Sequence, residues 1–320
     1  MWKTLHFTSL HFTSLSTNCV GKAKSRSNSG FTLIELSIVL VIIGLVVGGV
    51  LVGRDLIDAA SVRSQISQME KYQTAVRTFQ LKYDYLPGDI PDPYASQFGF
   101  IARGSGAGYG DGNGFIQSTA LDGRQNGEPV IFWRDLSEAN LINEKLTTAT
   151  FAGGTVTLTS SPGLYDWYPV AKIGQGNFIM VYYVQDSTDD GVHYYVISAL
   201  SMAGGANYAS SNPGLTPLQA FKIDQKLDDG LPQSGSIKAK YLNYNVATCT
   251  DIWASGGGVK GAGIVVSDPL NPFCFNYLPS TAATPATSIT CYDNGNTIGT
   301  TQHYSLTTNN LNCALSFKFK

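Results

Sequence analysis

The stretch from Phe31 to Val52 reads FTLIELSIVLVIIGLVVGGVLV, and Glu35 is its only ionisable side chain. About 20 apolar residues in a helix are enough to cross a bilayer. A cleaved secretory signal has a shorter apolar core followed by small residues in an A-x-A pattern. No such pattern follows Val52, where the chain continues as Gly53-Arg54-Asp55-Leu56. The stretch therefore predicts a membrane-spanning helix that stays in the protein.

Glu35 is out of place in such a helix unless it has a partner. An acidic side chain deep in a membrane helix costs about 2.5–3.5 kcal/mol on insertion scales, and a buried carboxylate is tolerated beside a cation. The nearest basic residues, Arg26 and Arg54, lie at the two ends of the stretch and are badly placed. An α-amino group could reach Glu35 if the chain were cut between Gly30 and Phe31 and a neighbouring copy docked there.

The segment Gly30-Phe31-Thr32-Leu33-Ile34-Glu35, preceded by GKAKSRSNS and followed by unbroken apolar sequence, resembles the processing site of type IV prepilins and of the pseudopilins of type II secretion. The resemblance covers about residues 21–83. It implies that a membrane prepilin peptidase cuts after Gly30 and methylates the amine of Phe31. It also implies that Glu35 then pairs with the N-terminal ammonium of an adjacent subunit during assembly.

The resemblance further implies the localisation and the partners of the chain. We expect it in the bacterial inner membrane before assembly, and afterwards in a periplasmic or cell-surface filament. Its expected partners are the prepilin peptidase, other pilin or pseudopilin subunits, an inner-membrane assembly platform and membrane lipid.

The first thirty residues have the charge of a cytoplasmic leader. Lys22, Lys24 and Arg26 precede the apolar stretch and no acid accompanies them, so the positive-inside bias directs the rest of the chain outward. The repeat HFTSL-HFTSL at residues 6–15 is unusual in a prepilin leader, and a start at Val20 would leave a more ordinary one. Loss of the leader's four basic residues changes the formal charge from −2 to −6. Nucleic acid is therefore not an expected partner.

Small and apolar residues recur at steps of three or four from Leu56 to Tyr83, which predicts an amphipathic continuation of the helix. No proline interrupts residues 31–85, and the prolines of LPGDIPDP end the helix. Glycines weaken its middle, either as a place to bend or as sites of close helix packing. They are Gly44, Gly48, Gly49 and Gly53. The domains expected are a leader (1–30), a transmembrane half-helix (31–52), an amphipathic half-helix (53–86) and an extracytoplasmic head (87–320).

The cysteines indicate an oxidising compartment. Cys19 lies in the leader, and the other four fall in the last quarter of the chain: Cys249, Cys274, Cys291 and Cys313. An even number in an exported domain predicts two disulfides with three possible connectivities. We favour Cys249 with Cys274 and Cys291 with Cys313. Zinc, the competing interpretation, prefers close pairs such as C-x-x-C, and these four are widely spaced.

Two segments raise the question of calcium. Asp111 and Asn113 alternate with glycines in ARGSGAGYGDGNGFI (102–116), which has no P-loop lysine, and an EF-hand alignment fails there. Asp228 and Asp229 precede Gly230, where ordinary turn chemistry is the alternative. A plain loop and a calcium ligand set remain open in both places, and no other cofactor is expected.

The remaining patterns predict an α+β head. We expect a helix over Glu128–Ile142, with Phe132, Leu136, Ala139 and Ile142 facing the core. We also expect a hairpin of strands over 177–185 and 191–200, a short helix within 218–232 that ends at Gly230, and irregular β structure braced by disulfides in Tyr241–Lys320.

Enzymatic motifs are missing from the sequence. G-x-S-x-G and H-E-x-x-H do not occur, and His193 and His303 are the histidines left after cleavage. We therefore predict a pilin-like structural subunit, not an enzyme: one long N-terminal helix packed on a mainly antiparallel sheet, with inserted loops and disulfides. Its large head favours a minor or tip subunit. The alternative is a membrane-anchored extracytoplasmic enzyme or adhesin that does not polymerise. Pilus, secretion pseudopilus and DNA-uptake fibre all remain open.

Overall fold

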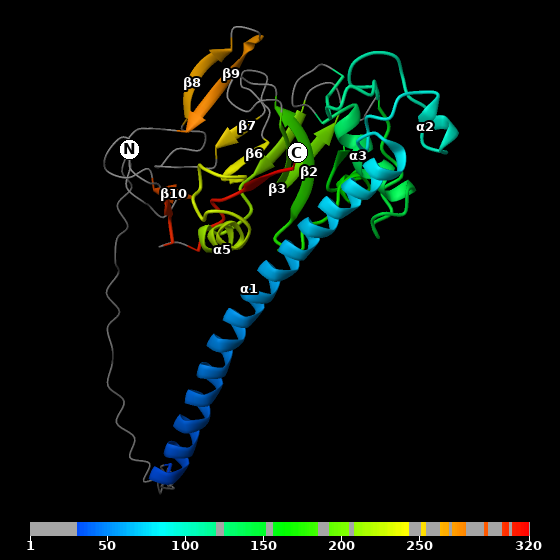
Figure 1. Cartoon of the computed structure of the whole chain (residues 1–320). Helices are drawn as coiled ribbons and strands as arrows, with labels where there is room; N and C mark the ends of the chain where they lie inside the picture. Colours follow the sequence, from blue (N-terminus) through cyan, green and yellow to red (C-terminus); the bar gives the residue numbers. More distant parts are fainter. Residues whose placement is uncertain are drawn as a thin grey trace, which may run out of the picture. The chain divides into compact units, whose positions relative to one another are not determined.

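The computed structural model describes eleven stretches of the chain: residues 31–119, 125–151, 156–184, 192–204, 208–242, 251–253, 263–268, 271–279, 291–293, 303–306 and 309–319. The chain divides into two units, Met1–Gly53 and Arg54–Lys320, and the boundary falls inside the long helix α1 (Leu33–Tyr83). Figure 1 shows the chain, with labels on α1 and on part of the elements of the head.

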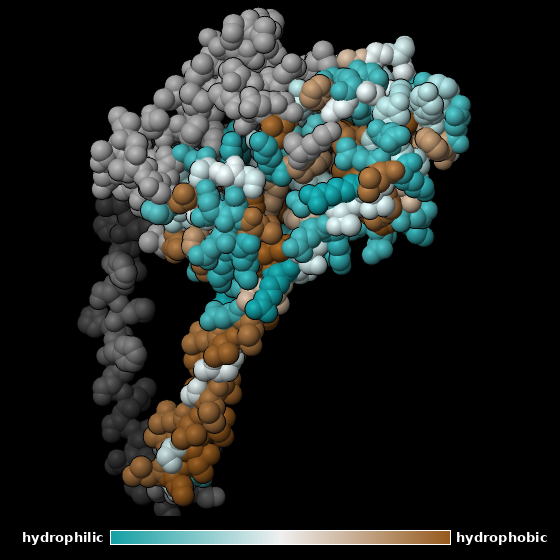
Figure 2. All heavy atoms as spheres, in the orientation of Figure 1, coloured by the Kyte–Doolittle hydropathy of each residue, from teal (hydrophilic) through white to brown (hydrophobic). Residues whose placement is uncertain are grey.

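The first unit contains the membrane-length part of α1. Its side chains are exposed along the described stretch and are almost all apolar, as the brown surface of this segment in Figure 2 shows. The helix continues without a break through Gly44, Gly48 and Gly49, and a Cβ at any of them would meet nothing within 4 Å. The glycines thus leave a bare strip on the single chain, which is compatible with both interpretations given above.

In the second unit, α1 buries one stripe of side chains, as its periodicity predicts from Val62 onward. The buried apolar members are Val62, Met69, Tyr72, Ala75, Val76, Phe79 and Tyr83. Two glutamines in the same stripe bind backbone: Gln65 Oε1 accepts from Ile173 N at 3.0 Å, and Gln68 Oε1 accepts from Lys172 N at 2.9 Å. The N-terminal end of the predicted stripe differs, because Leu56 remains exposed.

The head is built on a six-stranded antiparallel sheet with the long strand β3 (Val192–Gly204) at its centre. β2 (Asn177–Val184) pairs with β3 as the predicted hairpin, with Ile179 opposite Ile197. Three further strands contact β3 directly: β1 (Val156–Thr157), β4 (Tyr208–Asn212) and β12 (Leu315–Lys318). β5 (Ile237–Lys238) pairs with β12. The predicted α+β fold class is confirmed.

Smaller elements surround this sheet. Three two-stranded ribbons are β6 (Lys240–Leu242) with β7 (Asp251–Trp253), β8 (Gly263–Asp268) with β9 (Asn271–Pro279), and β10 (Tyr292–Asp293) with β11 (His303–Tyr304). The short helices are α2 (Tyr94–Gln97), α3 (Glu128–Glu138), α4 (Leu164–Trp167) and α5 (Pro217–Leu227).

Three sequence-based expectations need correction. α3 ends at Glu138 and not at Ile142, because Asn140 adopts a left-handed φ of 57° and Leu141 N bonds back to Leu136 O. Ala139 and Ile142 are half-buried beyond the helix. α5 ends at Leu227, before the predicted end at Gly230. The last part of the chain, expected to form irregular β structure, supplies a regular strand, β12, between β3 and β5.

A disulfide joins Cys291 to Cys313, the pair that the sequence favours, with their Cα atoms 4.9 Å apart. Both cysteines are buried, and the backbone of Cys313 also pairs with Leu215. The bridge therefore attaches the segment before β10 to the segment that leads into β12. Cys249 and the side chain of Cys274 lie outside the described residues.

A buried ion pair fastens the turn after α1 to α3. Arg103 Nη2 lies 2.6 Å from Asp135 Oδ2, and both side chains have no exposed area. Asp135 Oδ2 also accepts from Gly88 N at 2.6 Å, and Arg103 Nε donates to Ile90 O at 2.9 Å. One carboxylate and one guanidinium thus join the end of the α1 segment, a loop and α3.

Removal of one member of this pair should destabilise the head strongly. Asp135→Ala leaves the Arg103 guanidinium buried without its counter-charge, and we expect a loss of about 3–5 kcal/mol in the free energy of unfolding. Urea unfolding of the chain in detergent, followed by tryptophan fluorescence, measures it. Glu138→Ala is the matched control, because its pair with Arg134 is partly exposed and should contribute only about 0–1 kcal/mol. Equal losses in the two variants would contradict the assignment.

Candidate functional site

The carboxylate of Glu35 lies at the N-terminal end of α1, where it caps the helix. Glu35 Oε2 accepts from Thr32 N at 2.8 Å and from Thr32 Oγ1 at 2.7 Å, and Glu35 N donates back to Thr32 Oγ1 at 3.3 Å. This reciprocal arrangement is a capping box, whose pattern is Thr-x-x-Glu. The sequence contains that pattern, yet the sequence argument considered only an intermolecular partner. In the single chain, Glu35 has a local one.

The residue at the expected new amino terminus is freely accessible. Phe31 is 90% exposed and precedes the first turn of α1. Gly30, the residue before the expected cut, lies outside the described residues. An amine at Phe31 and the carboxylate of Glu35 would thus both be available to other molecules at this end of the helix.

The glycine-rich loop is held by two buried carboxylates. Asp89 accepts from Gly112 N and from Gly114 N, each at 2.8 Å. Glu128 accepts from Gly110 N at 2.8 Å and from Gln117 N at 2.7 Å. Four backbone N–H groups of one loop are thereby satisfied by two side chains, one after α1 and one at the start of α3.

The same carboxylates have the arrangement of a small cation site. Asp89, Asp111 and Glu128 each offer an oxygen, and these oxygens lie within 4.8 Å of one another. Calcium takes six to eight oxygen ligands, so a cation here would need further oxygens. Asn113, the other sequence candidate, donates through Nδ2 to Asp111 Oδ2 at 3.0 Å and forms an Asx turn with it. Asp89 and Glu128 are not among the ligands predicted from the sequence, because only the fold brings them beside Asp111.

A second acidic cluster follows α5 and contains both remaining calcium candidates. Oxygens of Asp224, Asp228 and Asp229 lie within 4.8 Å of one another. Each is also engaged in hydrogen bonds: Asp224 accepts from the hydroxyl of Tyr304 at 2.7 Å, and Asp228 accepts from Ile237 N at 2.9 Å. Asp229 accepts from Leu231 N, as in an Asx turn. The bonds of Asp228 and Asp229 agree with the turn interpretation, and calcium at this cluster stays a prediction.

Burial changes the acidity of three of these groups. It raises the pKa of Asp89 to about 7, the pKa of Glu128 to about 8 and the pKa of Asp224 to about 7, because removal from water disfavours the charged form. The backbone N–H donors oppose this shift, and the neighbouring acids reinforce it. A bound cation would reverse the shift by favouring the ionised carboxylates.

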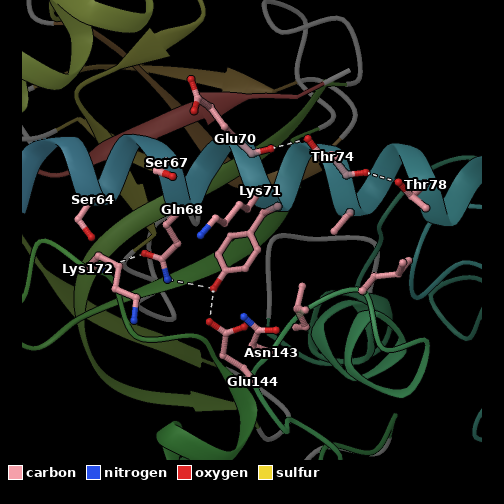
Figure 3. A pocket seen from close by; sticks show the side chains of 14 residues that line it. Ser64, Ser67, Gln68, Glu70, Lys71, Thr74, Thr78, Asn143, Glu144 and Lys172 are labelled. Carbon is pink, nitrogen blue, oxygen red and sulfur yellow. Dashed lines mark hydrogen bonds between the residues drawn. The ribbon is translucent and has the colours of Figure 1, made fainter.

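A groove of about 730 Å³ runs beside the outer half of α1, between the helix and residues 141–144 (Figure 3). On one wall, Tyr72 donates to Glu144 Oε1 at 2.9 Å and accepts from Gln68 Nε2 at 3.0 Å. Burial and the nearby carboxylate hold the pKa of Tyr72 above its usual range. The ammonium-bearing side chains of Lys71 and Lys172 also line the groove. It is a mixed polar and apolar surface, suited to a protein segment.

The buried histidine has a structural role. His193 Nε2 accepts from Ile116 N at 2.9 Å, and its ring lies against those of Phe115, Tyr183 and Phe319. His303 is exposed in β11. His193 is thus a packed histidine of the head's core.

A known protein family matches the N-terminal part of the chain, in agreement with the prepilin resemblance. Residues 25–51 match the family model described as the prokaryotic N-terminal methylation motif, which is the signature of type IV prepilins and pseudopilins. α1, which overlaps the matched residues, is long and apolar enough to cross a membrane. No curated protein and no solved structure matches the chain. The chain thus carries a prepilin-type amino-terminal segment, and the resemblance recognised at Gly30–Glu35 is confirmed.

The buried acids make the stability of the head depend on pH. In the folded state Asp89, Glu128 and Asp224 hold their protons up to about pH 7–8, whereas unfolded carboxyls lose them near pH 4. The folded state therefore binds more protons between these limits, and stability falls as the pH rises from 5 to 8. Urea unfolding at pH 5, 6.5 and 8 should show a decrease of at least about 1–2 kcal/mol.

Asp89→Asn is the control, because it removes one titrating group while keeping an oxygen acceptor, so the decrease should become smaller. A stability that is constant or rises between pH 5 and 8 would contradict this account. The same titration examines calcium: a cation held by Asp89, Asp111 and Glu128 would stabilise the head at pH 8 and weaken its pH dependence.

Proposed function

We propose that this chain is the precursor of a structural subunit of a type IV pilus or a type II secretion pseudopilus. The prepilin peptidase cuts after Gly30 and methylates the amine of Phe31, and the mature subunit enters a filament through its N-terminal helix. The observation that carries the proposal is the methylation motif at residues 25–51, which includes most of the bare apolar part of α1. Before assembly the subunit is held in the inner membrane, and an assembly platform there receives it.

Exposure of the helix supports assembly through this segment. Apolar side chains from Leu33 to Val52 are bare in the single chain, and exposed apolar surface of this extent requires either lipid or other subunits to cover it. When the subunit moves from the membrane into the filament, other subunits replace lipid around these side chains. The anchored enzyme is disfavoured because cleavage between Gly30 and Phe31 serves no purpose for an anchor.

The capping box gives Glu35 two successive partners under this proposal. In the precursor, the carboxylate caps the helix through Thr32, which leaves Glu35 Oε1 without a hydrogen bond from the described residues. In the filament, the ammonium of Phe31 from an adjacent subunit approaches the same carboxylate. The cap holds the carboxylate at the helix end, where an incoming ammonium would meet it.

The size of the head supports a minor or tip position. The second unit extends from Arg54 to Lys320, with three β ribbons added to the central sheet. Such additions enlarge the cross-section of the subunit beyond what the helix and sheet require. A large head is accommodated most readily where few copies are present or where no further subunit must be added above it.

The first test of the proposal is processing. Gly30→Leu should leave a membrane-held precursor of full length, because the resemblance implies that the peptidase needs a small residue before the cut. Mass spectrometry of the parent chain should find a mature, methylated amino terminus at Phe31. Gly49→Leu is the control, since it changes a glycine inside the helix and should be cut normally. A mature terminus elsewhere than Phe31 would refute the proposal.

The second test separates capping from charge pairing at Glu35. Removing one member of a buried ion pair typically costs about 3–5 kcal/mol, so Glu35→Ala and Glu35→Gln should be cleaved normally yet be nearly absent from sheared filaments. Thr32→Val removes the hydroxyl that contacts Glu35 but keeps the carboxylate, and a lost N-cap costs only about 0.5–2 kcal/mol. It should enter filaments far better than either Glu35 variant. If the Thr32 and Glu35 variants were equally defective, capping alone would explain the carboxylate.

A further inference from the structure

The groove beside α1 presents two lysine side chains that form no ion pair among the described residues. Lys71 and Lys172 line it and are both exposed, and no ion pair joins either of them to a carboxylate among the described residues. Glu144, the acid on the groove wall, is already bonded to Tyr72. In Figure 3, Glu70 projects from the side of α1 away from this network. Glu70 and Glu144 thus line the groove together with the two lysines, but the lysine ammonium groups have no ion-pair partner among the described residues and lie beside an apolar wall formed by Leu141 and Ile142.

The helix surface in the groove permits a close approach. Apart from Lys71, the side chains that α1 contributes along this line are mostly small: Ser64, Ser67, Thr74, Ala75 and Thr78. Helices pack with their axes about 8–10 Å apart, and the smaller distances need small side chains at the contact. A second helix is thus a suitable occupant by shape as well as by charge.

The same chain offers a matching segment just before the head. Asp55 and Asp58 are exposed, and no ion pair within the described ranges includes either one. Leu56 beside them is 66% exposed. Two acids three residues apart lie on one face of a helix, so this turn presents two negative charges and an apolar side chain, with one exposed cation, Arg54, four residues before Asp58. Its chemistry complements that of the groove.

The positions of the two surfaces around α1 favour open-ended association. At about 100° per residue, Asp55 and Asp58 point to the side of the helix opposite Ser64, Lys71 and Thr78. Two different surfaces on opposite sides of one element make a heterologous contact, which repeats without closing. Matching Asp58 to Lys71 displaces one copy along the helix axis by about 20 Å, at 1.5 Å per residue.

We propose that the groove lined by Lys71 and Lys172 receives the first outer turn of α1 from a second copy of this chain, with Asp55 and Asp58 against the two lysines. This inference rests on the proposed function, and it names the surface by which neighbouring subunits align outside the membrane-spanning stretch. It is separate from the Glu35 pair, which acts at the other end of the helix.

Charge reversal and its rescue test the contact. Lys71→Glu with Lys172→Glu should lower the amount of the chain in sheared filaments about ten-fold relative to the membrane pool, the factor that 1.4 kcal/mol produces, because like charges then face each other. Asp55→Lys with Asp58→Lys should have a similar effect. The four changes together restore opposite charges and should restore most of the filament content. Lys145→Glu and Lys226→Glu, exposed lysines that do not line the groove, are the controls and should have little effect.

A photoreactive amino acid at position 56 gives a second readout. In filaments it should form a product of two copies, with the attachment mapped to groove residues such as Leu141 or Ile142. Normal incorporation of both charge-reversed variants, failure of the combined variant to recover, or attachment to a different protein or to lipid would each overturn the inference. In those cases a parent chain cut at Phe31 and present in filaments leaves the proposed function intact. A parent chain that is never cut or never found in filaments removes both.

Discussion

The head depends on one seam, the line along which the outer half of α1 packs on the segment before β2. Apolar packing alone would let the helix slide, because a stripe of Val62, Met69 and Val76 offers little that fixes its position along the axis. Gln65 and Gln68 prevent this, since each binds a particular backbone N–H of residues 172–173. Buried amides that are bonded in this way specify one register, and Gln68 adds a bond from its Nε2 to Val170 O at 2.9 Å. The core therefore forms on a helix whose axial position is fixed by directed hydrogen bonds.

Buried carboxylates hold the loops of the head in place through hydrogen bonds to backbone N–H groups. Asp135, Asp89 and Glu128 accept from the backbone of the turn after α1 and of the glycine-rich loop. A glycine-rich chain loses much conformational entropy on folding, and it has few side chains with which to recover it. Backbone N–H groups bonded to buried acids offset part of that loss. Burial of these acids has a consequence: it raises the pKa of Asp89 and Glu128, so both are harder to ionise in the folded head.

Sequence reasoning succeeded where the signal is local. The apolar stretch, the stripe after Val62, the β2–β3 hairpin and the start of α3 at Glu128 follow from periodicity and turn chemistry over short windows. It failed where the signal depends on distant partners. β12 is four residues long and too short for a pattern, and Asp89 meets Asp111 and Glu128 only after folding. The overrun of α3 has a different cause: Asn140 tolerates the left-handed conformation that stops the helix. The Thr32–Glu35 capping box also follows a local pattern, Thr-x-x-Glu, and the sequence alone is enough to predict it.

The position of β12 has a consequence for export. Leu315 pairs with Ile197 and Phe317 with Ile237, so the middle of the sheet is completed by a segment that follows β3 by more than a hundred residues. If the head is exported as proposed, the outer half of α1 and the β2–β3 hairpin emerge first, with one edge of β3 unpaired along residues 194–197. An open strand edge readily pairs with other chains, and long-range strand pairing is slow. The emerging head is then an unfinished sheet until its own last strand arrives.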